Sequence, residues 1–300
     1  MAKVALIADN SAGLTEQEIK DYNVAKIIPI SFIVNGDEYY EHVNMSYTDF
    51  YNFLKDKNTT VSTSQPSVED VKDAWREVLK EYDEIVYILL SSGLSEACNS
   101  AINASNDDEF SGRVFVVNNQ KVSYLNKLAV FEARHLINQG KSAKEVKDYL
   151  EKTKMDCGIY IAVDTLKYLK KGGRITPAAA TIGTLLNIKP ILQIHGGKLD
   201  AYAKVMSMKQ AKTKIISAIR KEVEEKFPEE LKQGKVHIGM AHSNPTLDEH
   251  ELNLIEDEIK EAFPDMSLFK FDPLPLFIAC HTGPGALGIG YCVDHLGIIK

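Results

Sequence analysis

Three polar segments of the chain combine hydroxyl side chains with places where a helix is expected to start. Residues 61–67 carry four hydroxyl groups directly before a helix, residues 91–95 join an apolar run to a helix, and residues 281–288 follow an apolar run. Hydroxyl groups, free backbone N–H groups and the positive end of a helix dipole together favour a carboxylate or a phosphate. A serine or threonine before a helix is also an ordinary N-cap, so each segment alone remains open to a structural interpretation.

A single histidine, His281, stands at the start of the third segment. It precedes Gly283, Pro284 and Gly285, a run that predicts an unusual backbone path and a close approach by another group. The other seven of the eight histidines show no HxH or HExxH spacing, and the four cysteines show no CxxC spacing. We therefore expect no metal and no cofactor, and cysteines that stay reduced and structural.

Two charged segments allow more than one interpretation. Asp9 ends an apolar run two residues before Ser11, where a carboxylate either orients a hydroxyl or binds the N–H groups of a turn. Residues 169–175, LKKGGRI, are either the solvated end of a helix or a docking point for a phosphate or an acidic partner. This segment lacks the order GxxxxGK[ST], so it is not a P-loop.

These residue types also allow an enzyme. Ser95 would be the nucleophile, His281 its base and Asp9 the group that orients the base, giving a serine hydrolase or an acyl or phosphoryl transferase. Against this, Gly93, Ser95 and Ala97 do not form the GxSxG elbow that exposes a nucleophile. A pure protein-interaction module is the third alternative.

The elements that position these segments form two halves. In the first half, apolar runs predict buried strands at 4–8, 26–30, 85–90 and 114–117. Helices are predicted at 47–57, 67–82, 94–104, 122–138 and 142–153. This alternation predicts an N-terminal α/β domain, 1–156, with a mainly parallel sheet flanked by helices, whose strand ends are the usual place for a ligand.

The second half predicts an α/β domain with a mixed sheet at 157–300. Strands are expected at 159–163, 236–241, 267–272, 276–280 and 287–293, with a hairpin formed by 188–194 and 199–206 around a turn at 195–198. Helices are expected at 164–171, 178–186, 207–227 and 247–262. The ligand is expected between and inside the two domains.

Composition excludes several classes of protein. The net charge is −7 and no dense basic block is present, which disfavours nucleic-acid binding. No apolar stretch approaches the roughly 20 residues that a membrane span needs, and the first residues do not form a signal peptide. The expectation is a cytoplasmic protein without stable membrane insertion.

Six segments in this order resemble the DegV family. They are Asp9 with Ser11, TSQPS at 63–67, SGLS at 92–95, YLKKGGRI at 168–175, LNIKPIL at 186–192 and HTGPGALG at 281–288. The resemblance covers nearly the whole chain. It implies a non-enzymatic carrier protein of phospholipid metabolism that holds a long-chain fatty acid by its buried tail and presents the carboxyl group to a fatty acid kinase.

The resemblance also implies roles for single residues. Thr63 and Ser95 would hydrogen-bond the carboxylate, with Ser62 and Ser64 beside them, and His281 and Thr282 would complete the polar network. Arg174 would contact the kinase or the new acyl phosphate. The helix at 178–186 and the strand at 188–194 are apolar enough to wall a tunnel for the tail, although an ordinary core would look the same.

Three positions depart from the family pattern. Glu96 replaces a glycine after SGLS, residues 118–120 lack the usual acid, and Met206 stands where relatives commonly have arginine. Fatty acid binding is therefore a stronger expectation than partnership with a kinase.

Overall fold

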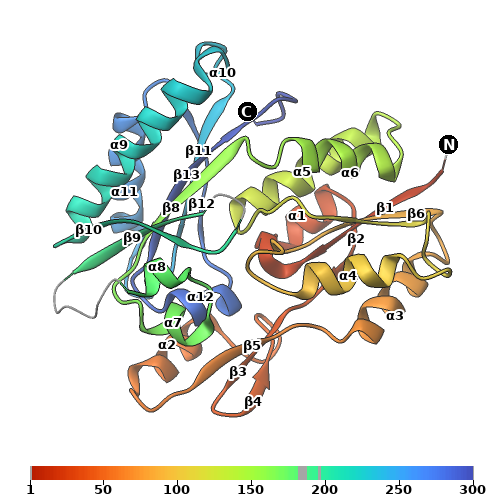
Figure 1. Ribbon diagram of the computed structural model, residues 1–300, viewed down its shortest axis with the longest axis horizontal. Coiled ribbons are helices and arrows are strands. Elements are labelled where there is room, and N and C mark those ends of the chain that lie inside the picture. Colours follow the sequence, from red (N-terminus) through yellow and green to blue (C-terminus); the bar gives the residue numbers. More distant parts are fainter. Residues whose placement is uncertain (1, 182–187, 195–196, 300) are drawn as a thin grey trace.

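The computed structural model describes residues 2–181, 188–194 and 197–299 (Figure 1). It has an α/β architecture with a parallel sheet flanked by helices and a second, mixed sheet, which confirms the predicted fold class. Two expected features lie partly outside the described residues, namely the end of the helix at 178–186 and the turn at 195–198. Among the described residues, no helix has both the length and the apolar character needed to span a bilayer.

The first sheet consists of four parallel strands in the order β2-β1-β6-β7. The strands are β1 (Val4–Asp9), β2 (Val24–Ile28), β6 (Glu84–Ile88) and β7 (Val114–Val117). Every residue of β1 is buried, as expected for a parallel strand that is covered on both faces. The helices α3 (Val68–Val78) and α4 (Ala97–Ser105) pack on one face, and α5 (Tyr124–Asn138) and α6 (Ala143–Lys152) pack on the other.

Helix starts in this half follow their sequence signals. The hydroxyl of Ser67 accepts a hydrogen bond from the Asp70 N–H at 3.1 Å, so α3 begins where the N-cap pattern predicted. Thr15 and Glu18 form a capping box at α1 (Glu16–Asp21), which follows the 3-10 turn η1 (Asn10–Ala12). Ser142 caps α6 in the same way.

A small antiparallel sheet, in the order β4-β3-β5, corrects one prediction. It contains β3 (Ser31–Val34), β4 (Asp37–Tyr39) and β5 (Val61–Ser64), with α2 (Tyr47–Lys55) packed beside it. Residues 61–64 were expected to be part of a polar loop and instead form β5, because β3 supplies the partner strand that their polar sequence does not announce.

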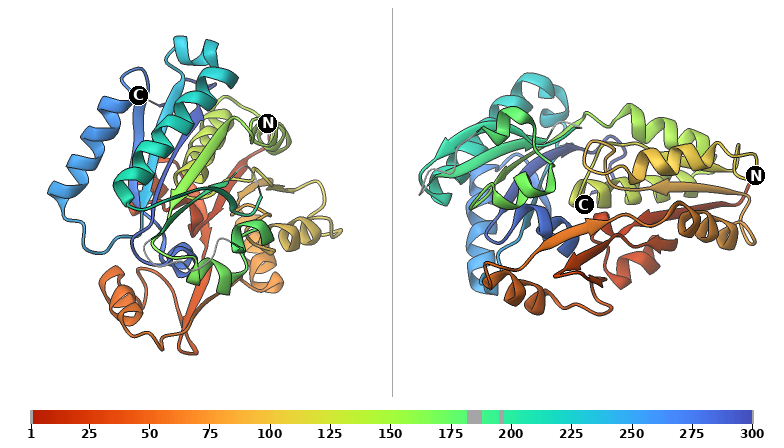
Figure 2. Two further views of the ribbon diagram at one scale, coloured as in Figure 1. Left: turned by 60° about the vertical axis from the view of Figure 1, so that its left-hand side comes forward. Right: turned by 60° about the horizontal axis from the view of Figure 1, so that its bottom comes forward.

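The second sheet has six strands in the order β10-β9-β8-β13-β11-β12, of which only β11 and β12 pair in parallel. The strands are β8 (Cys157–Ala162), β9 (Lys189–Ile194), β10 (Asp200–Val205), β11 (Val236–His242), β12 (Ser267–Pro273) and β13 (Leu287–Val293). The helices α9 (Met208–Lys226) and α11 (Glu249–Ala262) cover one face, and the short α10 (Pro228–Lys232) follows α9 (Figure 2).

The other face of this sheet turns toward the first half of the chain. It carries α7 (Lys167–Gly172), α8 (Pro177–Ala180) and α12 (Leu276–Thr282). The predicted strand at 276–280 is wrong, because these residues form α12. A short apolar run does not distinguish a strand from a buried helix, and Pro275 starts the helical turn here.

The two halves are packed together through α5. An ideal Cβ added at Gly239 on β11 would lie 2.2 Å from the Tyr124 ring, and one at Gly290 on β13 would lie 2.4 Å from its hydroxyl. The tail after β13 also returns to the first half, where Ile298 packs against the core of the first sheet and against the core that the small sheet shares with α12. The division into domains 1–156 and 157–300 stays a prediction, since this packing crosses it.

Candidate functional site

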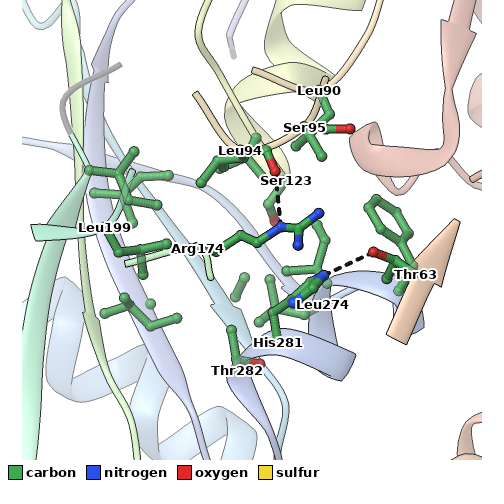
Figure 3. Close-up of a pocket in the computed structure, with 18 of the residues that line it drawn as sticks. Thr63, Leu90, Leu94, Ser95, Ser123, Arg174, Leu199, Leu274, His281 and Thr282 are labelled. Atoms are coloured by element: carbon green, nitrogen blue, oxygen red, sulfur yellow. Dashed lines mark hydrogen bonds between the residues drawn. The ribbon is translucent and has the colours of Figure 1, made fainter. Parts of the chain in front are cut away.

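A cavity of about 290 Å³ lies where the two halves and the small sheet meet (Figure 3). Most of its lining is aliphatic or aromatic and comes from both halves, namely Ile30, Leu90, Leu94, Val122, Tyr124, Ile159, Ile161, Leu169, Ile194, Leu199, Ala241, Leu274, Phe277 and Ile278. Its polar lining side chains are Thr63, Gln65, Ser95, Glu96, Ser123, Arg174, His281 and Thr282. An apolar cavity with a small polar set suits a guest that has a hydrocarbon body and one polar group.

Thr63 and His281 meet at the polar part of this cavity. The Thr63 hydroxyl, on β5, lies 3.0 Å from Nε2 of His281, in the last turn of α12 (Figure 3). On its other side the imidazole packs against Gly172, where an ideal Cβ would lie 2.2 Å from Nδ1. The ring is therefore fixed from two sides, and only glycine at 172 leaves room for it.

Burial keeps His281 neutral. Desolvation, with a smaller contribution from the positive charge of Arg174, lowers the pKa of His281 from 6.5 to about 4. A neutral imidazole has one ring nitrogen that donates and one that accepts a hydrogen bond. The His281–Thr63 pair can therefore offer a donor to an anion without bringing a second full charge into the cavity.

Arg174 supplies the cation of the site. It follows α7 and the Gly173 that caps this helix in the left-handed conformation, with φ of 67°. Its Nε donates to the Leu94 carbonyl oxygen at 3.2 Å, and its Nη1 donates to the carbonyl oxygen of Gly172. These bonds hold the guanidinium in the cavity lining between the two halves, rather than on an outer surface alone.

Ser95 lies in the turn that leads from β6 to α4. The N–H groups of Leu94 and Ser95 both donate to the Ser91 carbonyl oxygen, at 3.0 and 3.1 Å. The Ser95 hydroxyl accepts from the Ala97 N–H at 3.2 Å and still has a proton to donate. The adjacent Glu96 is exposed and accepts a hydrogen bond from the Asn99 side chain, so it faces solvent at the cavity rim.

Of the remaining predicted ligand residues, Thr282 lies in the cavity lining, whereas Ser62 and Ser64 do not. Thr282 is buried in the lining, and its hydroxyl donates to the Gly283 carbonyl oxygen at 3.2 Å. Ser62 and Ser64 alternate with Thr63 along β5, so they project to the opposite face of the strand and lie outside the cavity lining. They were predicted beside the ligand, and the structure does not bring them there.

Asp9 is separate from the cavity. Its carboxylate accepts from the Ser11 N–H at 2.9 Å, from the Ser11 hydroxyl and from the Leu90 N–H at 2.8 Å. Burial raises the pKa of Asp9 to about 6 despite these bonds. Among the described residues, the contacts of Asp9 and His281 do not join them, so the Ser95–His281–Asp9 relay is not assembled.

Sequence reasoning missed Ser123 and Gln65 in the lining. Ser123 precedes α5 with φ of 57° and ψ of −138°, a backbone conformation that glycine favours. Nothing in the residue type announces this conformation. Gln65 directly follows β5, and the alternation of the strand places it on the Thr63 side once the strand is known.

Comparison with known proteins places the chain in a family. A sequence model described as an uncharacterised protein of the DegV family matches residues 3–294. The chain belongs to the DegV family. Protein DegV of Bacillus subtilis is 28% identical over 292 residues, which cover 96% of this chain and 99% of that protein. The resemblance drawn from the six motifs is thereby confirmed.

Solved DegV structures share this fold. The fatty acid-binding DegV family protein from Thermus thermophilus superimposes with a TM-score of 0.83 at 29% identity, covering 97% of this chain and 99% of that one. DegV from Bacillus subtilis, a fatty acid-binding protein, gives 0.80 at 27% identity, covering 98% and 100%. A DegV lipid-binding protein from Thermotoga maritima gives 0.77 at 28% identity, covering 97% and 98%.

Proposed function

We propose that this protein binds a long-chain fatty acid, with the tail in the apolar cavity and the carboxylate held by Thr63, Ser95 and His281, while Thr282 completes the polar network. The observation that carries the proposal is the hydrogen bond between Thr63 and a neutral His281 in the polar part of an otherwise apolar cavity. A carboxylate buried without donors is very costly, so hydroxyl and imidazole donors are what such a guest needs.

The tail supplies most of the binding free energy in this proposal. Each buried CH₂ contributes about 0.8 kcal/mol, so a chain of about 16 carbons binds tightly with few polar contacts. Ile159 and Ile161 of β8, with Ile194 of β9, form the apolar wall of the second half. The fatty acid binding of the DegV relatives from Thermus thermophilus and Bacillus subtilis supports the same guest here.

A finer proposal concerns the fate of the bound acid. The protein would act as a carrier without turnover of its own and present the carboxyl group to a fatty acid kinase, with Arg174 facing the partner or the acyl phosphate. Among the described contacts of Arg174, Nη2 has no hydrogen bond, so it is free to meet an anion. Met206, which is 62% exposed and directly follows β10, stands where relatives commonly have arginine. The proposal of a kinase partner is therefore less well supported than the proposal of fatty acid binding.

The first experiment is mass spectrometry of small molecules extracted from denatured protein that was purified without detergent. A near-stoichiometric fatty acid is the expected result, and it also reports the preferred chain. Absence of lipid, even after incubation with palmitate or oleate, would contradict the proposal.

A second experiment separates the carrier from a hydrolase. The protein is treated with a fluorophosphonate probe, and the adduct is located by peptide mapping. We expect no labelling of Ser95, because His281 bonds to Thr63 and Asp9 bonds to Ser11 and Leu90. Labelling of Ser95 that is lost in His281→Gln would instead favour the enzyme.

A further inference from the structure

Ser123 is the residue before α5 and lines the cavity at 6% exposure. Its φ of 57° and ψ of −138° are the angles of a glycine at the first central position of a type II′ turn. A serine in such a conformation costs on the order of 1–3 kcal/mol. The chain therefore tolerates strain here that a glycine would remove.

The Ser123 side chain does not do what a serine before a helix normally does. It makes no capping hydrogen bond to α5, and no partner for its hydroxyl occurs among the described residues. Its carbonyl oxygen accepts from the N–H groups of Asn126 and Lys127, at 2.8 and 3.1 Å. The wall of the cavity thus carries a hydroxyl that is available to a guest.

The first N–H groups of α5 are also unused. Within the part of the chain that the structure describes, the N–H groups of Tyr124 and Leu125 have no acceptor. Both residues are buried, at 2% and 3% exposure, so solvent does not satisfy these donors. An anion in the cavity is the partner that such a helix end favours, because the dipole of a 15-residue helix adds to its free donors.

We propose that the Ser123 hydroxyl and the first N–H groups of α5 form a second anchor for the carboxylate of the guest. This inference rests on the proposed fatty acid binding and adds a contact to it. In the view of Figure 3, Ser123 falls between the turn of Leu94 and Ser95 and the guanidinium of Arg174, which is the polar part of the cavity. The anchor recognises the negative charge, so it selects a carboxylate over a neutral head group of the same chain length.

The test compares Ser123→Ala and Ser123→Gly with Ser62→Ala, an exposed serine outside the cavity. Affinities for palmitate and for hexadecanol are measured by calorimetry on delipidated protein. Both Ser123 variants are expected to lose about tenfold in palmitate affinity and less than twofold in hexadecanol affinity, because a hydrogen bond to a charged group is worth more than one to a neutral group. Ser62→Ala is expected to match the wild type.

Stability separates a binding role from a purely structural one. Lipid-free Ser123→Gly is expected to melt above Ser123→Ala, because glycine adopts the left-handed φ without strain. If Ser123→Gly is the more stable of the two variants and still binds palmitate more weakly than the wild type, the weaker binding reflects a lost ligand contact and not a loss of folding. Unchanged palmitate affinity in both Ser123 variants would overturn the inference while leaving fatty acid binding intact.

A further measurement covers the case in which the wild type does not bind palmitate. The Leu125 amide resonance, in leucine-labelled protein and assigned with Leu125→Met, is followed during titration with octanoate. A saturable shift that is lost in Ser123→Ala supports the anchor even though the carrier function fails. No shift in the wild type overturns the anchor as well.

Discussion

The Thr63 hydroxyl and His281 Nε2 lie 3.0 Å apart although 218 positions separate the two residues in sequence. Thr63 comes from the small sheet of the first half and His281 from α12 of the second half. The polar part of the cavity therefore exists only when the small sheet and α12 are packed together. Each substitution below tests one of the contacts that hold this arrangement.

Ser95→Ala is expected to lower fatty acid retention more than stability. The hydroxyl accepts one hydrogen bond from the Ala97 N–H at 3.2 Å, so its loss costs about 1 kcal/mol of folding free energy. Loss of a donor to the carboxylate is expected to reduce lipid affinity about tenfold. Lipid extraction and urea unfolding of the same samples measure both effects, with Ser62→Ala as the matched control. Unchanged lipid occupancy would remove Ser95 from the site.

Gly172→Ala is expected to displace the imidazole of His281. The new Cβ would lie 2.2 Å from Nδ1, a distance that real contacts do not reach, so the ring has to leave its hydrogen bond with Thr63. We expect a shift of the His281 ring resonances in NMR spectra and a clear loss of bound lipid. Gly197→Ala serves as control, because an added Cβ there meets nothing within 4 Å. Equal lipid content in the two variants would show that the position of His281 does not matter.

The stability of lipid-free protein is expected to fall between pH 7 and pH 5 partly because of His281. The pKa of His281 is lowered to about 4 by burial, so the unfolded chain binds this proton near pH 6.5 while the folded protein does not. The contribution is complete above pH 6.5 and is lost as the pH falls toward 4. Between pH 7 and pH 5 it amounts to about 2 kcal/mol.

Urea unfolding of the wild type and of His281→Gln at both pH values isolates this contribution. Glutamine still offers a hydrogen-bonding partner to Thr63 and does not titrate, so the variant is expected to lose less stability on acidification than the wild type. Burial raises the pKa of Asp9 to about 6, so its protonation favours the folded protein as the pH falls. This opposite contribution is the same in the wild type and in His281→Gln. Parallel pH profiles for the two proteins would count against a buried neutral His281.

Glu41, which lies outside the cavity lining, is expected to position α12. Its Oε2 accepts a hydrogen bond from the Leu276 N–H at 2.8 Å, at the start of the helix. Pro275, the N-cap residue, makes no capping hydrogen bond of its own. Burial raises the pKa of Glu41, as expected for a carboxyl group inside the protein. Glu41→Ala leaves the Leu276 N–H unsatisfied and is expected to cost about 1–3 kcal/mol in unfolding free energy and to reduce lipid retention.

Glu41→Gln retains an oxygen that accepts the same bond, so it is expected to recover most of both losses. Equilibrium unfolding and lipid extraction of the two variants provide the comparison. If the glutamine variant behaves like the alanine variant, the charge of Glu41 matters more than its bond to Leu276.

Much of the fold follows from local sequence signals. The apolar runs of β1, β6 and β7 predict a parallel sheet because such strands are buried on both faces, and Ser67 marks the start of α3 through its N-cap. The polar β5 was not predicted, since its strand conformation depends on pairing with β3. The residues of α12 were assigned to a strand because five apolar residues in a row carry no periodicity.

Part of the site was predictable from the sequence, and part depended on the strand and on tertiary packing. Motif order identified the family and brought Thr63, Ser95, His281 and Thr282 into consideration, and the cavity lining contains all four. Ser62 and Ser64 were grouped with Thr63 because a loop has no faces, whereas a strand sends alternate side chains in opposite directions. The backbone conformation of Ser123 arises from tertiary packing, which the residue type does not encode.

The ring of Tyr124 occupies space that exists only because Gly239 and Gly290 lack side chains. The ring therefore packs α5 against β11 and β13 of the other half. Rotation of the halves about a hinge near residue 156 would withdraw the ring and leave a void, at a cost of about 3–5 kcal/mol for a large aromatic residue. The chain should consequently melt in a single transition, and exchange of a guest should proceed by local fluctuations of the cavity walls while the halves stay together.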